Sequence, residues 1–185
     1  MSQSGKTAIG GMITALSVVV LMPTALEVFV YALPAFAGML IMFSVVELDK
    51  RWAFGIYAAV SLLSLMLVPN KEAAVLYAAF FGYYPILKAV VESKLPRVAE
   101  YIVKFAVFNV AMILSYAALV KVFGMPFDEL MGIEGETGFL ARYMLPLMLG
   151  MGNVAFILFD VATTRIITVY LNVWQKKFRK LFPFK

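Results

Sequence analysis

Long apolar runs, separated by short charged or proline-containing turns, dominate this chain of 185 residues. Hydrophobic residues make up 63% of it and charged residues only 15%, whereas a soluble domain has roughly one half and one quarter. Because a membrane-crossing helix needs about 20 apolar residues, we expect lipid to surround most of the chain. The runs cover residues 7–22, 26–46, 52–68, 73–91, 98–123 and 143–173.

These runs predict helices rather than strands. Backbone groups in lipid must be satisfied within a helix or a closed barrel, and the runs do not alternate with the period of two that a barrel strand requires. We therefore predict an all-α, polytopic membrane protein with six transmembrane helices over residues 1–173. Residues 174–185 mix aromatic and basic side chains, which is typical of an interfacial tail.

Lysine and arginine residues predict the orientation of these helices, because they are enriched in cytoplasmic loops. Basic residues cluster before the first run, after the second, after the fourth and after the sixth. The intervening loops are mostly acidic. This alternation predicts that both termini are cytoplasmic. The basic clusters also make anionic lipids a more fitting partner than nucleic acid.

The residue types that are absent exclude several functions. The chain has no cysteine and no histidine, which excludes disulfides, thiol nucleophiles, histidine bases and Cys/His metal sites. No P-loop sequence of the G-x-x-x-x-G-K-[ST] type occurs. We therefore expect neither an enzyme nor a bound metal or cofactor.

Six ionisable residues fall within or at the edge of the apolar runs, in the half predicted to be cytoplasmic. An ionisable group at this depth costs several kcal/mol unless it faces a partner or water. Three are acids and three are bases, which favours mutual pairing. They form either a network that locks helices together, or a proton or ion path, or a coupling surface for a partner. The residues are Glu47, Lys88, Glu92, Lys104, Asp160 and Arg165.

Aromatic and polar residues near the ends of the runs that are predicted to face the outside suggest a small-molecule site. The same residue types suit an interfacial aromatic belt. Asn153, within the last run, either bridges helices or contacts a ligand. The candidate ligand contacts are Glu27, Tyr31, Asn70, Tyr77, Arg142, Tyr143 and Asn153.

The first run, "AIGGMITALSVV", carries small residues at helical spacing, with Gly11 and Ala15 four residues apart. Small residues let a second helix approach closely. This face packs either against another helix of the same chain or against another subunit.

The architecture and the first run together resemble the substrate-binding S-component of energy-coupling-factor (ECF) transporters. In that family, an Ala-xxx-Ala pattern on the first helix docks onto a transmembrane coupling subunit. Gly11-xxx-Ala15 matches the spacing, with glycine in place of one alanine. The resemblance implies a multi-pass protein of the bacterial cytoplasmic membrane that binds a small water-soluble nutrient, such as a vitamin, at the outer face. It also implies a coupling subunit and two ATPase subunits as partners.

Two other classes stay open. A non-transporting membrane scaffold, similar to the MreD-type cell-shape proteins, would have the same six-helix architecture, a packed outer half and no ligand. A lipid-modifying membrane enzyme fits less well, because the chain lacks histidine, cysteine and a nucleophile elbow.

Overall fold

The computed structural model describes residues 3–130 and 139–175, and every regular element in these ranges is a helix. The prediction of an all-α fold is confirmed for this part of the chain, which contains no strand. The predicted interfacial tail lies outside the described residues apart from Trp174 and Gln175.

The first three apolar runs form α1 (Gln3–Leu21), α2 (Ala32–Glu47) and α3 (Lys50–Leu67). Two 3-10 turns, Met22–Ala25 and Glu27–Phe29, separate α1 from α2. Pro23 disfavours helical backbone in the residue before it and has no N–H to donate, so α1 ends just before it. With the two 3-10 turns in between, α2 begins at Ala32 rather than at residue 26.

Asp49 caps α3 in the tight turn that follows α2. Its side chain accepts hydrogen bonds from the backbone N–H of Trp52 at 3.0 Å and of Arg51 at 2.9 Å. Lys6 Nζ lies 3.5 Å from the other carboxylate oxygen. The hydrogen bond from Trp52, then that from Arg51 and the charge of Lys6, hold the pKa of Asp49 below its usual range. This ion pair also joins the beginning of α1 to the α2–α3 turn.

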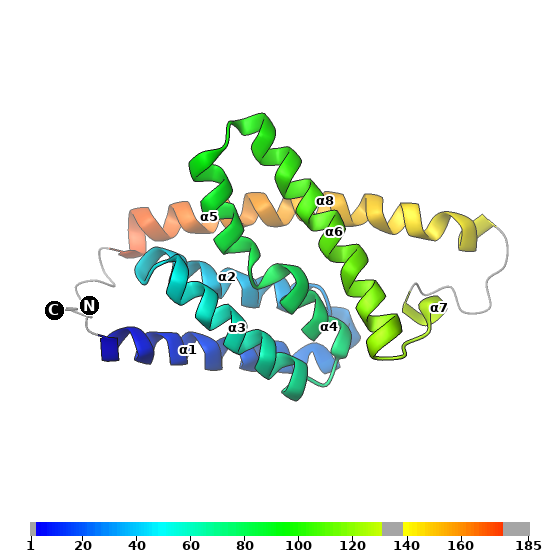
Figure 1. Cartoon of the computed structure of the whole chain (residues 1–185), viewed down its shortest axis with the longest axis horizontal. Helices are drawn as coiled ribbons and strands as arrows, with labels where there is room; N and C mark the ends of the chain where they lie inside the picture. Colours follow the sequence, from blue (N-terminus) through cyan, green and yellow to red (C-terminus); the bar gives the residue numbers. More distant parts are fainter. Residues whose placement is uncertain (1–2, 131–138, 176–185) are drawn as a thin grey trace.

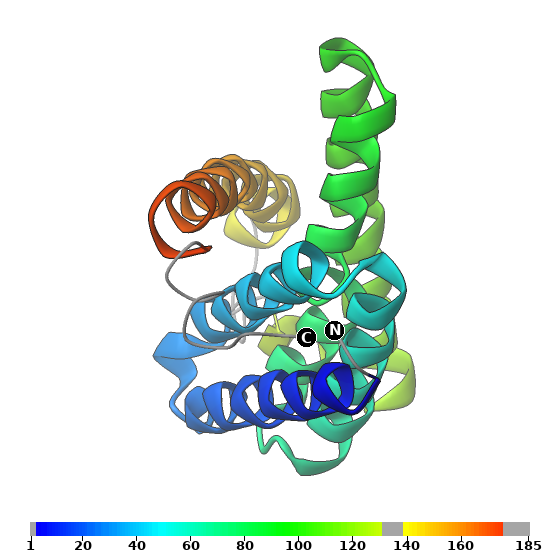
Figure 2. The same cartoon turned by 90° about the vertical axis from the view of Figure 1, so that its left-hand side faces the viewer.

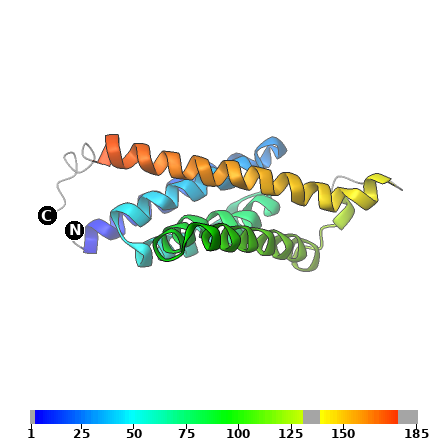
Figure 3. The ribbon, with the colours of Figure 1, turned by 90° about the horizontal axis from the view of Figure 1, so that it is seen from above.

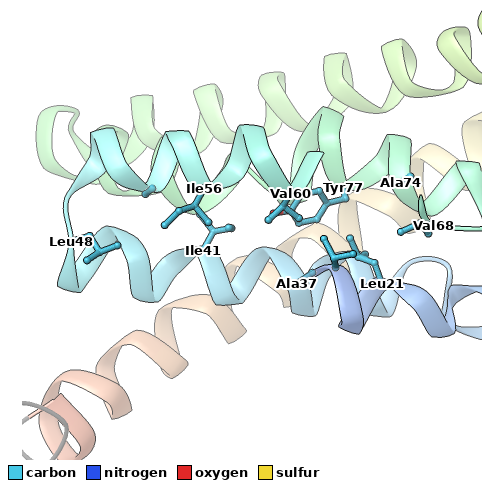
Figure 4. Close-up of a cluster of buried hydrophobic side chains, with 11 residues drawn as sticks. Leu21, Ala37, Ile41, Leu48, Ile56, Val60, Val68, Ala74 and Tyr77 are labelled. Carbon is cyan, nitrogen blue, oxygen red and sulfur yellow. The ribbon is translucent and has the colours of Figure 1, made fainter. Parts of the chain in front are cut away.

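Side chains from α1, α2 and α3, together with Ala74 and Tyr77 of the fourth run, form the first core, and Figure 4 shows them pointing toward one another. Because lipid is as apolar as these side chains, close packing rather than exclusion of water holds such helices together in a membrane. The fully buried members include Leu21, Ala37, Ile41, Val60 and Tyr77.

The fourth run does not form one continuous α-helix. It consists of α4 (Lys71–Leu76), a π-helical turn over Tyr77–Phe81 and α5 (Tyr84–Lys94). Pro85 lies in the first turn of α5, where its missing N–H breaks no helical hydrogen bond. The π turn passes very close to α2: a Cβ built on Gly38 would lie 2.3 Å from the backbone oxygen of Phe81. Only glycine fits at this crossing.

The remaining runs form α6 (Arg97–Val122) and α8 (Phe139–Val169), and a second π-helical turn, Tyr170–Trp174, extends α8. A short helix, α7 (Phe127–Leu130), lies between them in sequence. Aromatic rings join α5, α6 and α8 in a second core. Phe108 and Phe156 stack with their ring centroids 4.8 Å apart, and Phe80 contacts both rings edge-on.

The helices lie in two groups. In Figure 1, α1, α2 and α3 run side by side, whereas α5 and α6 form a hairpin that crosses α8. Figure 2 shows the tip of this hairpin projecting beyond the other helices. Seen from above, α8 runs along most of the length of the molecule (Figure 3). The start of α1, the α2–α3 turn and the end of α8 lie at one end.

Four stretches of the described residues are long and apolar enough to cross a membrane, against the six that the sequence predicts. They are Gln3–Ala25, Lys71–Lys94, Arg97–Val122 and Pro146–Trp174. Helix α2 is apolar but shorter. Large hydrophobic side chains, such as Met12, Met66 and Leu158, are exposed on the outer faces, as a lipid-facing surface requires.

Candidate functional site

A buried cluster of charged side chains joins α5, α6 and α8. Lys88 on α5 and Lys104 on α6 are almost fully buried, with 2% and 1% of their side chains exposed. Asp160 on α8 is also buried. Glu92 on α5 and Glu100 on α6 complete the set, which we call the ion cluster.

Each lysine of the ion cluster contacts more than one carboxylate. Lys88 Nζ forms an ion pair with Asp160 Oδ1 and lies 2.6 Å from Glu92 Oε1. Lys104 Nζ lies 2.7 Å from the same oxygen of Glu92, 2.6 Å from Glu100 Oε1 and 3.3 Å from Asp160 Oδ1. The cluster is therefore one connected network across three helices.

The spacing of these residues on their helices explains the cluster. Lys88 and Glu92 are four residues apart on α5, as are Glu100 and Lys104 on α6, and residues at this spacing share one helix face. Tyr84, a further turn before Lys88, donates its hydroxyl hydrogen bond to Asp160 Oδ1. Sequence reasoning missed Tyr84 and Glu100, although the same spacing of four from a buried lysine would have found both.

The ion cluster holds three carboxylates and two ammonium groups. Two lysines at this burial are stable only when paired and hydrogen-bonded, and here each has at least two anionic partners. Glu92, with 38% of its side chain exposed, forms the edge of the cluster. No group of three or more possible ligand residues that could hold a metal ion occurs in the part of the chain that the structure describes.

Two of the six predicted ionic residues lie outside the cluster. Arg165 follows Asp160 by five residues, which places it about 140° around the helix, and its side chain is exposed. Glu47, at the end of α2, accepts hydrogen bonds from Tyr170 at 3.1 Å and Gln175 at 3.0 Å. The structure thus brings together Lys88, Glu92, Lys104 and Asp160, and leaves Glu47 and Arg165 near the end of α8.

A smaller polar group lies at the start of α2 and α4. Tyr31 donates a hydrogen bond to Glu72 Oε1 at 2.9 Å, and its hydroxyl is 3.2 Å from that of Tyr116 on α6. Of these three residues, sequence reasoning singled out only Tyr31. Glu72 and Tyr116 are far apart in sequence, so no local spacing relates them.

The other predicted ligand contacts have separate positions. Asn70 caps α4 by accepting from Ala73 N at 3.0 Å. Tyr77 is fully buried, and its hydroxyl has no hydrogen-bond partner among the described residues. Glu27 lies exposed in its 3-10 turn. Tyr143 is exposed at the start of α8.

Asn153 pairs with another amide rather than facing open space. Its Nδ2 donates to Asn109 Oδ1 at 3.0 Å, and Asn109 Nδ2 donates back to Asn153 Oδ1 at 2.9 Å. The reciprocal pair joins α6 to α8. The side chain of Arg142 lies outside the described residues. The six predicted ligand contacts whose side chains the structure describes thus have separate partners, and none of them lines the groove between α1 and α3 or the groove between α2 and the end of α8.

The small-residue face of α1 divides between two environments. Gly10 is buried, and a Cβ built on it would lie 3.4 Å from Ile56 of α3. Gly11 and Ala15 are exposed, and a Cβ on Gly11 would meet nothing within 4 Å. Packing within the chain therefore uses Gly10 and leaves the predicted Gly11-xxx-Ala15 face open.

Comparisons with protein-family models, with curated proteins and with solved structures find no significant match to this chain. The class of the protein follows from its own features: it is all-helical in the described part, with several apolar helices suited to a membrane.

Proposed function

We propose that this protein is a membrane-embedded subunit of a larger transport assembly, acting as the substrate-binding S-component of an ECF-type importer. The observation that carries the proposal is an open groove between α1 and α3, with small residues on both walls. The groove has a volume of about 510 Å³. It is lined by Thr7, Gly10, Gly11, Thr14, Arg51, Trp52, Gly55, Ile56 and Ala59.

The groove suits a helix of another membrane subunit. A Cβ built on Gly11 or on Gly55 meets nothing within 4 Å, so both glycines leave room that their own chain does not fill. Small residues allow two helix backbones to come close, and this contact is a main source of helix association in lipid. Docking of a coupling subunit along α1 would use this room.

In the proposed assembly, the chain crosses the bacterial cytoplasmic membrane six times with both termini inside. It captures a small water-soluble nutrient at the outer face and passes it inward. The polar group of Tyr31, Glu72 and Tyr116 supports a neutral or cationic nutrient, because a carboxylate beside two tyrosines repels anions. Since the chain has no P-loop, two ATPase subunits supply the energy.

A second candidate is a non-transporting membrane scaffold of MreD type. The observation that favours it is the scattered arrangement of the predicted ligand contacts in the described residues, none of which lines either of these two grooves. A scaffold would use the α1–α3 groove to hold a partner and would need no ligand. The two candidates share the docking step and differ in whether a small molecule is bound.

The test is native mass spectrometry of the protein gently extracted from its own membrane, with the wild-type chain beside two variants. Gly11→Trp fills the groove, whereas Gly150→Trp adds the same side chain to an exposed glycine of α8 with nothing within 4 Å. We expect the wild type and Gly150→Trp to retain a membrane partner and Gly11→Trp to lose it.

The bound species then separate the two candidates. A nutrient together with scaffold and ATPase subunits supports the importer. Envelope proteins without a small molecule support the scaffold. Equal retention of partners by both tryptophan variants contradicts docking through α1.

A further inference from the structure

A second groove lies between α2 and the end of α8. Its volume is about 420 Å³, within the range of ligand sites. One residue of α2, three of α8 and two of the following π-helical turn line it: Phe43, Arg165, Ile166, Val169, Tyr170 and Trp174. All of these side chains except Arg165 are apolar or aromatic, so the groove suits a hydrocarbon chain better than a water-soluble ligand.

Arg165 brings a positive charge to this groove, and no acid within residues 3–130 and 139–175 forms an ion pair with it. Asp160, five residues earlier, pairs with Lys88 and Lys104. Glu47 accepts hydrogen bonds from Tyr170 and Gln175 near the end of α8. None of the ion pairs within the described ranges includes Arg165, and its side chain is exposed.

Among the described residues no carboxylate is paired with Arg165, so this cation is available to an anion from outside the chain. Within a membrane, an arginine close to a helix end extends its guanidinium toward the headgroups. A phosphate group fits it well, because the planar fork of guanidinium donors can hold two phosphate oxygens at once.

The aromatic residues of the groove place it near a membrane surface. Tyr170 and Phe43 make an edge-on ring contact, with centroids 4.8 Å apart, and Trp174 is 61% exposed. Tyrosine and tryptophan concentrate at headgroup level. Tyr170 and Trp174 are the first and last residues of the π-helical turn that follows α8. In sequence, the basic segment "KKFRK" follows at residues 176–180, as expected for an anionic lipid surface.

We propose that this groove, which we call the lipid groove, binds one anionic phospholipid. An acyl chain lies against Phe43, Ile166 and Val169, and the phosphate lies on the Arg165 guanidinium. The apolar lining recognises the acyl chain, and Arg165, the charged residue of the described lining, selects the anionic headgroup. This proposal does not depend on whether the protein belongs to an importer or a scaffold.

The test measures lipid binding to the full-length protein in detergent by native mass spectrometry. The probes are phosphatidylglycerol and phosphatidylcholine with the same acyl chains. We expect one phosphatidylglycerol molecule to bind at least about tenfold more tightly than phosphatidylcholine. Arg165→Gln should remove this preference, because a charge-assisted hydrogen-bonded contact is lost. Arg97→Gln removes the same charge at an exposed position of α6 and should retain the preference for phosphatidylglycerol.

A second pair of variants tests the acyl-chain part without changing charge. Val169→Trp fills the lipid groove and should weaken phosphatidylglycerol binding at least about tenfold, even if Arg165→Gln fails to fold. Val154→Trp, on an exposed position elsewhere on α8, should not. Equal binding of the two lipids, equal losses in the two arginine variants, or unchanged binding in Val169→Trp would each overturn the proposal.

Discussion

The replacement of Lys88 by methionine, a side chain of similar length, tests the ion cluster directly. Lys88 pairs with both Asp160 and Glu92, as Lys104 does from the neighbouring helix. Without it, Asp160 keeps only Lys104, at 3.3 Å, and the Tyr84 hydroxyl. Removal of one partner from a buried ion pair typically costs about 3–5 kcal/mol, because the other charge stays buried. We expect Lys88→Met to lower the free energy of unfolding by about this amount.

The charge balance of the cluster predicts how a second change combines with the first. With all five groups ionised, the net charge is −1, and Lys88→Met makes it −2. Asp160→Asn keeps the shape and brings the net charge to 0, so it should cost less, about 1–3 kcal/mol for weakened charge-assisted hydrogen bonds. The double variant returns to −1. We expect it to be no less stable than Lys88→Met alone.

Thermal unfolding in detergent, followed by circular dichroism, measures these effects. For a chain of this length, a loss of about 1 kcal/mol in the free energy of unfolding lowers the Tm by about 2–4 °C. The loss of about 3–5 kcal/mol expected for Lys88→Met therefore corresponds to a fall of about 6–20 °C in Tm. Lys121→Met, at an exposed position near the end of α6, is the control and should leave the Tm unchanged. An unchanged Tm in Lys88→Met or Asp160→Asn, or strictly additive losses in the double variant, would refute the buried pairing.

Three further predictions concern other parts of the fold. Gly38→Ala should destabilise the protein by about 1–3 kcal/mol, because its Cβ would lie 2.3 Å from the backbone of the π turn. The control Gly55→Ala adds a Cβ where there is open space and should leave the Tm unchanged. Equal Tm values for the two variants would contradict the close crossing. Asn153→Leu should lower the free energy of unfolding by about 1–3 kcal/mol, since two interhelical hydrogen bonds are lost. Adding Asn109→Leu to this variant should lower it little further. Two equal, additive losses would count against a reciprocal pair. Acidification should weaken the cap of α3: because the pKa of folded Asp49 is depressed, its stabilisation is present above the unfolded pKa and is lost as the pH falls below about 4. The Tm of Asp49→Asn, whose side chain caps without titrating, should fall less over that range, and identical pH profiles would argue against this role.

The sequence predicts the helices well because their signal is local. Each apolar run contains a helix, and the pairing of Lys88 with Glu92 follows from their spacing of four. The two π-helical turns are not visible in the composition of the runs. The break before α5 has one local signal, Pro85, which the apolar character of its neighbours hides.

The candidate ligand site was less predictable, because it depends on how the helices are arranged. Tyr31 meets Glu72 and Tyr116 only through the packing of α4 and α6, and Asn153 meets Asn109 across two helices. Membrane depth alone grouped Arg165 with Asp160, although the helical rotation between them separates the two. Depth and residue type identify candidates, whereas the face of each helix decides which of them meet.

The π turn over Tyr77–Phe81 has a consequence for how the gene can change. Tyr77 packs into the core of α1–α3, while Phe80 and Tyr84 pack into the aromatic core with α6 and α8. Deletion of a single codon within this turn would rotate all of α5 by about 100° relative to α4. Lys88 would then face away from Asp160, and both cores could not form together. Insertions and deletions should therefore be tolerated in the connecting loops but selected against in these five positions, even where the hydrophobicity of the segment is preserved.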